Sequence, residues 1–551
     1  MKKILLVVTA LMMWAGAMAQ QPRAEYPRPQ FERAEWVNLN GEWTYTLDLV
    51  KTGWERNLMK SEGFDGKIIV PFAPESKLSG VEHTEFIPCI WYQREITIPA
   101  EWSGKDVLLN FGAVYYESEV YIDGQFVDRH FGGSDSFSVD ITKFVEAGKS
   151  HSLVVSASSD LRAGRQSAGK QSLRHGPFEC MYTRTTGIWQ TVWMEAVAPT
   201  AIKRVKYTTD IDRSAVTMEF TMRRNAVGDV LTINVKDGAK VVATDTAPVA
   251  SGSIVTLPIK KAKLWSPESP FLYDVEFILK NAAGQVIDKV DSYFGMRKIH
   301  TVGNKIYLNN EPFYQRLVLD QGFYPDGIYT APSDEELCAD VERSMAMGFN
   351  GARLHEKVFE ERFLYHCDRM GYMVWGEYGS WSMNSTELDA VAIFLPEWLE
   401  SVRRDYNHPA LITWCPFNES WDTTHHFPEL QGKEQNNDVI RIIYEQTKLL
   451  DPTRPCVDTS GNYHVVTDIY DIHDYDQNPE TGLLSLKEEI PMPGGMGPRH
   501  LVFADAGLQK GFTGYFHKAI LQQNTSGVSH KLFAIRRELF TAWKPEEYRT
   551  S

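Results

Sequence analysis

Residues 334–381 read DEELCADVERSMAMGFNGARLHEKVFEERFLYHCDRMGYMVWGEYGSW, and this stretch decides the fold of the C-terminal part of the chain. A run with the period of an amphipathic helix is followed by a short apolar run, and the same order then repeats. Helix and buried strand alternate about five times after Gly295, which predicts βα units. The roughly 250 residues available favour a (β/α)₈ barrel. A doubly wound sheet is the alternative, although no Gly-rich phosphate loop follows any of these strands.

The residues before this stretch predict two β-sandwiches. From Trp36 to Glu195 polar and apolar residues alternate between turn signals, and Asp123-Gly124 joins two alternating runs as a hairpin turn would. Residues 199–293 continue in short strands with the spacing of a small immunoglobulin-like sandwich. The predicted fold class is therefore a multidomain chain of β-sandwiches followed by an α/β barrel.

The overall composition excludes several classes of protein. The 551 residues are 43% hydrophobic, as in a folded protein, so disorder and a collagen-like structure are excluded. The 57 Lys and Arg against 72 Asp and Glu leave a net charge of −15, which argues against a nucleic-acid partner. We expect no cofactor or metal site, and the oligomeric state is open.

The N-terminus has the pattern of a secretory signal. Lys2 and Lys3 precede an apolar run from Ile4 to Ala15, and Ala17-Met18-Ala19 forms a small-residue cleavage site. The apolar run is short for a membrane span, and no other such segment is recognised, so we expect no membrane insertion. The mature chain is predicted to begin near Gln20 and to be periplasmic or extracellular.

Chemistry-bearing residues stand where the predicted barrel strands end. Catalytic groups of such barrels lie at the carboxyl ends of strands. Reading those ends in order selects the following side chains: Asp320, Arg353, His355, Glu356, Glu377, Asn418, Glu419, His473, Asp474 and Tyr475. Carboxylates, an arginine, a histidine and aromatic rings together indicate a site for a polyol, and two carboxylates could act on a glycosidic bond.

The segment NHPALITWCPFNESW at residues 407–421 resembles the NHP…W…NE segment of glycoside hydrolase family 2, the β-galactosidase, β-glucuronidase and β-mannosidase group. Other pieces similar to that family follow in its order: LNGEW (39–43), WYQREITIP (91–99), YIDG (121–124), YTRTTGIWQTVW (182–193), LWSPESPFLY (264–273), FGMRKI (294–299) and FNGARLH (349–355). The resemblance implies four consecutive parts: a signal peptide at 1–19, a sugar-binding-like jelly roll at 20–198, an immunoglobulin-like sandwich at 199–296 and a catalytic TIM barrel at 297–551.

The resemblance also implies roles for individual residues. Glu419 would be the acid/base, and Asn418 would hold the sugar 2-hydroxyl. Arg353 would orient a carboxylate at the floor of the subsite. The remaining expected substrate contacts are His355, Glu377, Trp414 and Tyr475, although the family's histidine comes slightly later than His355 does here.

The expected nucleophile is where this chain departs from the family. That residue is a Glu at the end of strand 7, and no Glu after Glu419 lies in such a segment. The strand-like run HLVFADAGLQ offers Asp505 instead, whose side chain is one methylene shorter. The tail from about Lys510 lacks the alternation of strand, loop and helix seen in the barrel, so an incomplete or altered C-terminal part of the barrel is an open alternative.

Three functions are compatible with these observations. The first is a retaining exo-β-glycosidase acting on oligosaccharides or glycoconjugates, β-galactosidase-like by mild preference. The second is a catalytically impaired homologue that binds carbohydrate without turnover. The third treats the sandwiches as adhesion modules, but this leaves Asn418 and Glu419 unexplained.

Overall fold

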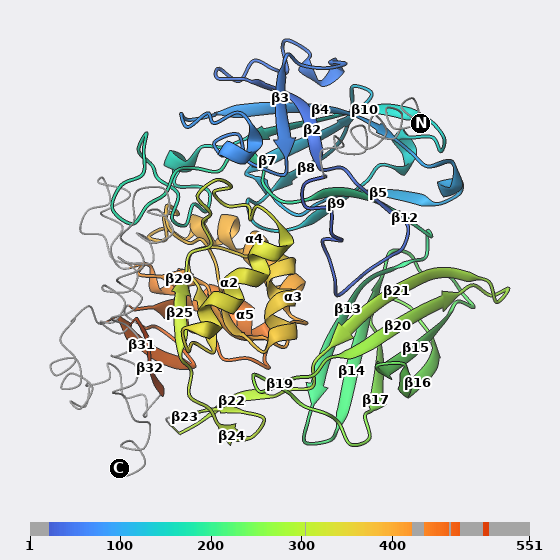
Figure 1. The fold of residues 1–551 in the computed structure, drawn as a ribbon, viewed down its shortest axis with the longest axis vertical. Coiled ribbons are helices and arrows are strands. Elements are labelled where there is room, and N and C mark those ends of the chain that lie inside the picture. Colours follow the sequence, from blue (N-terminus) through green and yellow to red (C-terminus); the bar gives the residue numbers. More distant parts are fainter. Residues whose placement is uncertain (1–20, 304, 421–434, 462–463, 474–499, 506–551) are drawn as a thin grey trace, which may run out of the picture.

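The computed structural model describes residues 21–303, 305–420, 435–461, 464–473 and 500–505. Three bodies of regular structure follow one another along the chain (Figure 1). A first β-sandwich lies at the top of the view, a second lies at the lower right, and helices near the centre lie beside parallel strands to their left. Among the described residues, no helix is both long and apolar enough to cross a membrane.

The first sandwich packs two antiparallel sheets around one apolar core. Its four-stranded sheet has the order β1 (Trp36–Asn38), β12 (Val192–Val197), β5 (Asp106–Phe111) and β9 (Phe137–Asp140). Its six-stranded sheet has the order β3 (Gly66–Val70), β2 (Gly41–Leu47), β4 (Cys89–Thr97), β10 (Ser150–Ser158), β7 (Glu117–Ile122) and β8 (Gln125–Phe131). A short pair, β6 (Val114–Tyr115) and β11 (Gly187–Ile188), lies beside them. The predicted hairpin is confirmed, because Asp123 and Gly124 join β7 to β8 with φ angles of 51° and 75°.

The second sandwich has the two sheets that the regular spacing of short strands predicted. One sheet has the order β13 (Ile202–Asp210), β14 (Ala215–Met222) and β17 (Ser253–Pro258). The other has the order β16 (Lys240–Pro248), β15 (Val230–Asp237), β20 (Tyr273–Lys280) and β21 (Val286–Phe294). Every second residue of β15 is buried, which places one face of each strand in the shared core.

Short antiparallel pieces accompany this sandwich: the first two lie between β17 and β20 in the chain, and the last three lie between β21 and the barrel. They are β18 (Trp265–Ser266), β19 (Ser269–Pro270), β22 (Ile299–Val302), β23 (Lys305–Leu308) and β24 (Glu311–Pro312).

Parallel strands and their helices form the third body. Four strands pair in the order β25 (Leu317–Asp320), β26 (Gly351–Leu354), β27 (Met373–Glu377) and β28 (Leu411–Cys415). Two further parallel pairs follow, β29 (Phe417–Asn418) with β30 (Thr459–Ser460) and β31 (Ile469–His473) with β32 (His500–Asp505). The helices are α2 (Asp334–Ala346), α3 (Glu361–Met370), α4 (Asp389–Asp405) and α5 (Asn437–Leu450). The tail from Lys510 lies outside the described residues.

Helix α4 begins earlier than the sequence pattern indicates. The amphipathic run EWLESVRRD begins at Glu397, but the helix already begins at Asp389 and contains Pro396. Proline has no backbone N–H and normally marks a helix boundary, so the pattern suggests a start after it. The helix continues because Ala390, Phe394 and Trp398 are buried on one side of it.

Candidate active site

The carboxyl ends of the barrel strands bring together residues selected from the sequence. Arg353 on β26 is in register with Trp375 on β27, and Glu377 at the end of β27 is in register with Cys415 on β28. Asn418 ends β29, which runs parallel to β30. Parallel strands end on the same edge of a sheet, so these residues lie at one rim of the barrel.

A buried arginine holds two of these residues together. The Arg353 guanidinium donates from Nε to Glu377 Oε2 and from Nη2 to Asn418 Oδ1, both at 2.6 Å. These three side chains are buried, and the contact with Arg353 fixes the amide orientation of Asn418. Asn418 Nδ2 then has no hydrogen-bond partner within the described part of the chain. An orphaned buried donor of this kind suits a ligand acceptor such as a sugar hydroxyl.

Glu419 follows β29 directly and lies against a histidine of β31. Its Oε1 is 2.5 Å from Nδ1 of His473, and its backbone N–H donates to the Ser460 carbonyl at 3.0 Å. Its φ of 44° lies in the left-handed region, which is uncommon for a residue other than glycine. The Glu419 side chain is 25% exposed, whereas that of His473 is 3% exposed. Glu419 therefore combines a fixed position with an accessible carboxyl group, as a proton donor requires.

Close packing and a buried acid fix the His473 ring. A Cβ on Gly461, whose φ is +73°, would lie 2.3 Å from this ring, so the position requires glycine. His473 Nε2 lies 3.1 Å from Ser460 Oγ, and that hydroxyl donates to Asp471 Oδ2 at 2.5 Å. Burial alone would raise the pKa of Asp471, but hydrogen bonding and charge from His464 lower it to about 2. An ionised carboxylate thus anchors the chain of contacts that ends at Glu419.

Two further carboxylates of the site are buried and already engaged. Besides its contact with Arg353, Glu377 accepts the backbone N–H of Glu356 at 3.0 Å. The Glu356 carboxylate accepts hydrogen bonds from Ser380 Oγ at 2.8 Å and from the Trp381 backbone N–H at 2.9 Å. Burial, together with the charge of Glu377, raises the pKa of Glu356 to about 8. Neither carboxylate is exposed, so neither is placed to attack a sugar in an open site.

His355 is a neutral ring in the same buried layer. Its Nδ1 lies 3.0 Å from Glu377 Oε1 but makes no well-directed hydrogen bond among the described residues. Burial, and the positive charges of Lys170 and Arg353, lower the pKa of His355 well below its usual value. The ring is therefore a second orphaned polar group close to Asn418 and Arg353.

Sequence reasoning did not find Trp381 or Lys170. The Trp381 indole N–H donates to the Asn418 carbonyl at 2.9 Å, and Lys170 Nζ lies 3.6 Å from the indole ring centroid. Trp381 ends the quoted run GEYGSW, so its place after a strand was a usable signal. Lys170 comes from the first sandwich, and no local pattern links it to the barrel.

The remaining expected contacts have different outcomes. Trp414 is buried within β28, where its indole N–H donates to Asp451 Oδ2 at 2.7 Å and its ring packs against Trp398. This core position argues against the expected substrate contact. Tyr475 lies outside the described residues. The backbone of Asp505 ends β32 in register with His473, the residue that contacts Glu419.

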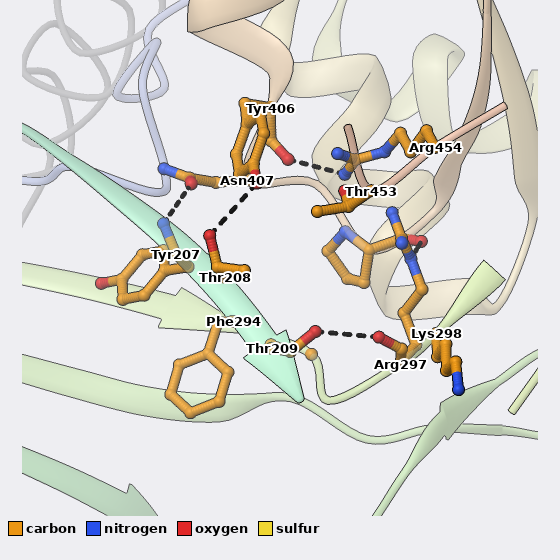
Figure 2. A pocket seen from close by; sticks show the side chains of 12 residues that line it. Tyr207, Thr208, Thr209, Phe294, Arg297, Lys298, Tyr406, Asn407, Thr453 and Arg454 are labelled. Carbon is orange, nitrogen blue, oxygen red and sulfur yellow. Dashed lines mark hydrogen bonds between the residues drawn. The ribbon is translucent and has the colours of Figure 1, made fainter. Parts of the chain in front are cut away.

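A separate cavity lies at the opposite end of the barrel strands (Figure 2). It has a volume of about 70 Å³ and lies where β13 of the second sandwich meets the segment before β28. Tyr207 N–H donates to Asn407 Oδ1 at 2.9 Å, and Thr209 Oγ1 donates to the Arg297 carbonyl at 2.8 Å. Because barrel active sites lie at the carboxyl ends of the strands, we interpret this cavity as part of a domain junction.

Comparison with known proteins gives consistent matches along the chain. The models of the sugar binding domain, the central domain and the TIM barrel domain of glycosyl hydrolases family 2 match residues 37–164, 200–297 and 304–490. They confirm the predicted fold class.

Two curated relatives and one solved structure illustrate the similarity. The β-glucuronidase of Felis catus is 25% identical over 82% of this chain and 72% of its own length. The β-galactosidase of Thermoanaerobacter pseudethanolicus is 26% identical over 66% of this chain and 50% of its own length. A structure of the β-glucuronidase from Ruminococcus gnavus in complex with D-glucuronic acid has a TM-score of 0.68 at 19% identity, covering 82% of this chain and 78% of that one. This last likeness is one of fold.

Proposed function

Because the chain belongs to glycosyl hydrolases family 2 and is a glycoside hydrolase, we propose that it is a retaining exo-β-glycosidase with Glu419 as acid/base. The observation that carries this proposal is the 2.5 Å contact between the partly exposed Glu419 carboxyl group and His473. Beside it, Asn418 Nδ2, which has no hydrogen-bond partner among the described residues, is available for a sugar hydroxyl.

Each group then has a defined task in two steps. In the first, Glu419 gives its proton to the glycosidic oxygen as the bond from that oxygen to the anomeric carbon breaks, and a carboxylate on the opposite face bonds to that carbon. In the second, Glu419 takes a proton from water, whose oxygen displaces the carboxylate. We assign Asp505 as the carboxylate on the opposite face, because its backbone ends the strand that pairs with the strand of His473.

A second candidate function is carbohydrate binding with impaired turnover. The observation that favours it is that Glu356 and Glu377 are buried and engaged, which leaves Asp505 with a shorter side chain than the family's Glu. Retaining hydrolysis needs its two carboxyl groups about 5–5.5 Å apart. Replacement Asp505→Glu tests this directly: if reach limits catalysis, the longer side chain raises kcat, whereas Asp505→Ala removes the remaining activity.

An assay on several substrates identifies the terminal sugar that the protein hydrolyses. The sequence favours a galactoside, and the named relatives include both β-glucuronidases and a β-galactosidase. The purified chain is assayed on 4-nitrophenyl β-galactoside, β-glucuronide, β-glucoside and β-mannoside, and the anomer first released is identified by NMR. We expect hydrolysis of at least one substrate with retention. Inverted product contradicts the mechanism, and sugar binding without hydrolysis of any substrate favours the second candidate.

We also propose that the protein acts in the periplasm or outside the cell. The Lys-Lys, apolar and Ala-Met-Ala order of residues 2–19 supports this proposal. N-terminal sequencing of protein recovered from the cell exterior or periplasm is expected to begin near Gln20. Recovery of an intact Met1 terminus would contradict it.

A further inference from the structure

A short segment of the first sandwich, residues 168–170, reaches the rim of the barrel, and we call it the strap. Ala168 N–H donates to the Trp381 carbonyl at 3.1 Å, and Gly169 N–H donates to the Gly379 carbonyl at 3.3 Å. A Cβ on Gly169, whose φ is +54°, would lie 2.0 Å from the Glu356 carbonyl oxygen. The next residue, Lys170, is thereby fixed against the loop that follows β27.

Among the described residues, the Lys170 ammonium group has no carboxylate within ion-pair distance. The residue is 4% exposed, and its ammonium group lies over the Trp381 ring and 3.6 Å from Cys180 Sγ. A thiol is a weak acceptor, and an ammonium group has three donors. Within the described ranges, Lys170 forms no ion pair with a carboxylate. A buried cation without a counter-ion is costly, so its place calls for an anion that arrives with a ligand.

The position of this cation links it to the proposed sugar site. Trp381, beneath the ammonium group, donates to the carbonyl of Asn418, the residue before Glu419. The positive field of Lys170 reaches His355 and Glu356, which lie in the same layer. His355 Nδ1 and Asn418 Nδ2 are both buried polar atoms without a hydrogen-bond partner in the described structure. His355 lies within reach of the charges of both Lys170 and Glu419, which places these groups in one region of the rim.

We infer that Lys170 is a specificity-determining residue that binds an anionic substituent, a carboxylate or a sulfate, on the terminal sugar of the substrate. This inference rests on the proposed function, since it places the sugar beside Glu419. It makes the first sandwich a contributor to the active site of the barrel. A neutral hexoside would leave the ammonium group without its counter-ion and would bind more weakly.

Binding measurements test the inference without requiring turnover. Calorimetric titration compares D-glucuronic acid with D-glucose, and D-galactose 6-sulfate with D-galactose, on the full chain. Hydrogen bonds to charged groups lead us to expect one anionic sugar to bind about 10- to 100-fold more tightly than its neutral counterpart. The pair that shows the preference identifies carboxylate or sulfate as the group bound. Equal affinity within both pairs would overturn the inference, whatever the hydrolytic activity.

Variants separate charge recognition from a merely structural role. Lys170→Met is expected to reduce the preference to less than about threefold while affinity for the neutral sugar is retained, and Lys170→Arg is expected to keep most of it. The matched control is Lys206→Met, because Lys206 Nζ lies 4.3 Å from the Tyr406 ring centroid at the other junction. Equal losses for anionic and neutral sugars in Lys170→Met would assign the residue a structural role and overturn the inference. A preference that survives in Lys170→Met would also overturn it. Absence of hydrolysis by the wild-type chain, with its preference for the anionic sugar present, would instead contradict the proposed function alone.

Discussion

The barrel meets a β-sandwich at two junctions, and these differ in the groups that they place near Glu419. At the junction with the second sandwich, the Asn407 side chain accepts from Tyr207 N–H at 2.9 Å and donates to the Val205 carbonyl at 2.8 Å. The Asn407 side chain thus satisfies two backbone groups of β13, as a neighbouring strand would. At the junction with the first sandwich, Lys170 is buried against the Trp381 ring and forms no ion pair with a carboxylate of the described residues.

Unsatisfied groups such as His408 Nε2 also lie near the second junction, but those at the first junction lie near Glu419, and this position indicates which junction serves chemistry. Satisfied backbone groups and paired side chains contribute to stability, whereas orphaned donors and unpaired charges reduce it and are retained where a ligand needs them. His355, Asn418 and Lys170 all lie at the carboxyl ends of the strands, together with Glu419. Variants at this end should therefore change activity or selectivity, and variants at the other end should change stability alone.

The largest effect is expected for Glu419→Gln. The amide keeps the size of the side chain but removes the transferable proton, so kcat should fall about 10²- to 10⁴-fold on substrates with poor leaving groups. Substrates with very good leaving groups should lose less. Steady-state kinetics measures the loss, and thermal melting should give an unchanged Tm.

The control for this prediction lies at the other junction. Glu400, which pairs with Arg204 at 3.0 Å, is replaced by Gln in the same way. Its activity should equal that of the wild type. Equal rates for Glu419→Gln and wild type on a poor leaving group would remove Glu419 from the mechanism.

The sequence was a good guide where the signal is periodic and local. Alternation along β7 and β8 with Asp123-Gly124 between them predicted a hairpin that the structure contains. Strand ends were also informative, because Arg353, Glu377 and Asn418 meet as expected for parallel strands.

Three features that the sequence analysis missed or assigned differently have physical explanations. Every residue of β28 is buried, so the pattern could not tell which face Trp414 occupies, and the tryptophan lies in the core. Lys170 could not be assigned, because its contact with Trp381 joins segments far apart in the chain. The first turns of α4 were missed because Pro396 usually marks a helix boundary. The helix forms nonetheless, since burial of its side chains outweighs the lost hydrogen bond.

The next largest effect is expected for Gly169→Ala. An alanine there has a strained φ and a Cβ 2.0 Å from a backbone carbonyl, so we expect a loss of about 2–4 kcal/mol in the free energy of unfolding. Activity should fall with it, because the strap also positions Lys170 and the loop of Trp381. Denaturant unfolding and kcat/KM on the same preparation measure both effects.

Gly238→Ala is the matched control for the strap. Gly238 has a similar φ of +59° but no atom within 4 Å of a Cβ, so its replacement should cost only about 1 kcal/mol. Its activity should be unchanged. A Gly169→Ala variant that behaved like Gly238→Ala would show that the strap is not tightly held against the barrel.

A smaller effect, confined to stability, is expected for Asn407→Ala. The variant leaves the Tyr207 N–H and the Val205 carbonyl without their partner, which should cost about 1–3 kcal/mol. Denaturant unfolding measures this loss. Since Asn407 lies before β28, away from the carboxyl ends, kcat and KM of the folded protein should remain those of the wild type. A change in selectivity for the sugar would contradict the claim that variants at this junction change stability alone.

The smallest effect is a pH dependence at the first junction. Glu397 on α4 accepts backbone hydrogen bonds from Gly133 at 2.9 Å and Ser134 at 2.8 Å, and its other oxygen lies 2.6 Å from the Tyr378 hydroxyl. Burial, then the charge of Asp135, raises the pKa of Glu397 to about 7 from an ordinary value of 4.5.

Because the folded protein binds this proton more tightly than the unfolded chain, the stability it contributes is complete below about pH 4.5 and is lost as the pH rises to about 7. Glu397→Gln imitates the protonated side chain, since its amide can donate to the Tyr378 oxygen while its carbonyl keeps both backbone N–H groups. We therefore expect the decline of Tm between pH 5 and pH 8 to be shallower in Glu397→Gln than in the wild type. The exposed Glu268→Gln serves as the control and should keep the wild-type slope. An unchanged slope in Glu397→Gln would contradict a raised pKa of this carboxyl group in the folded protein.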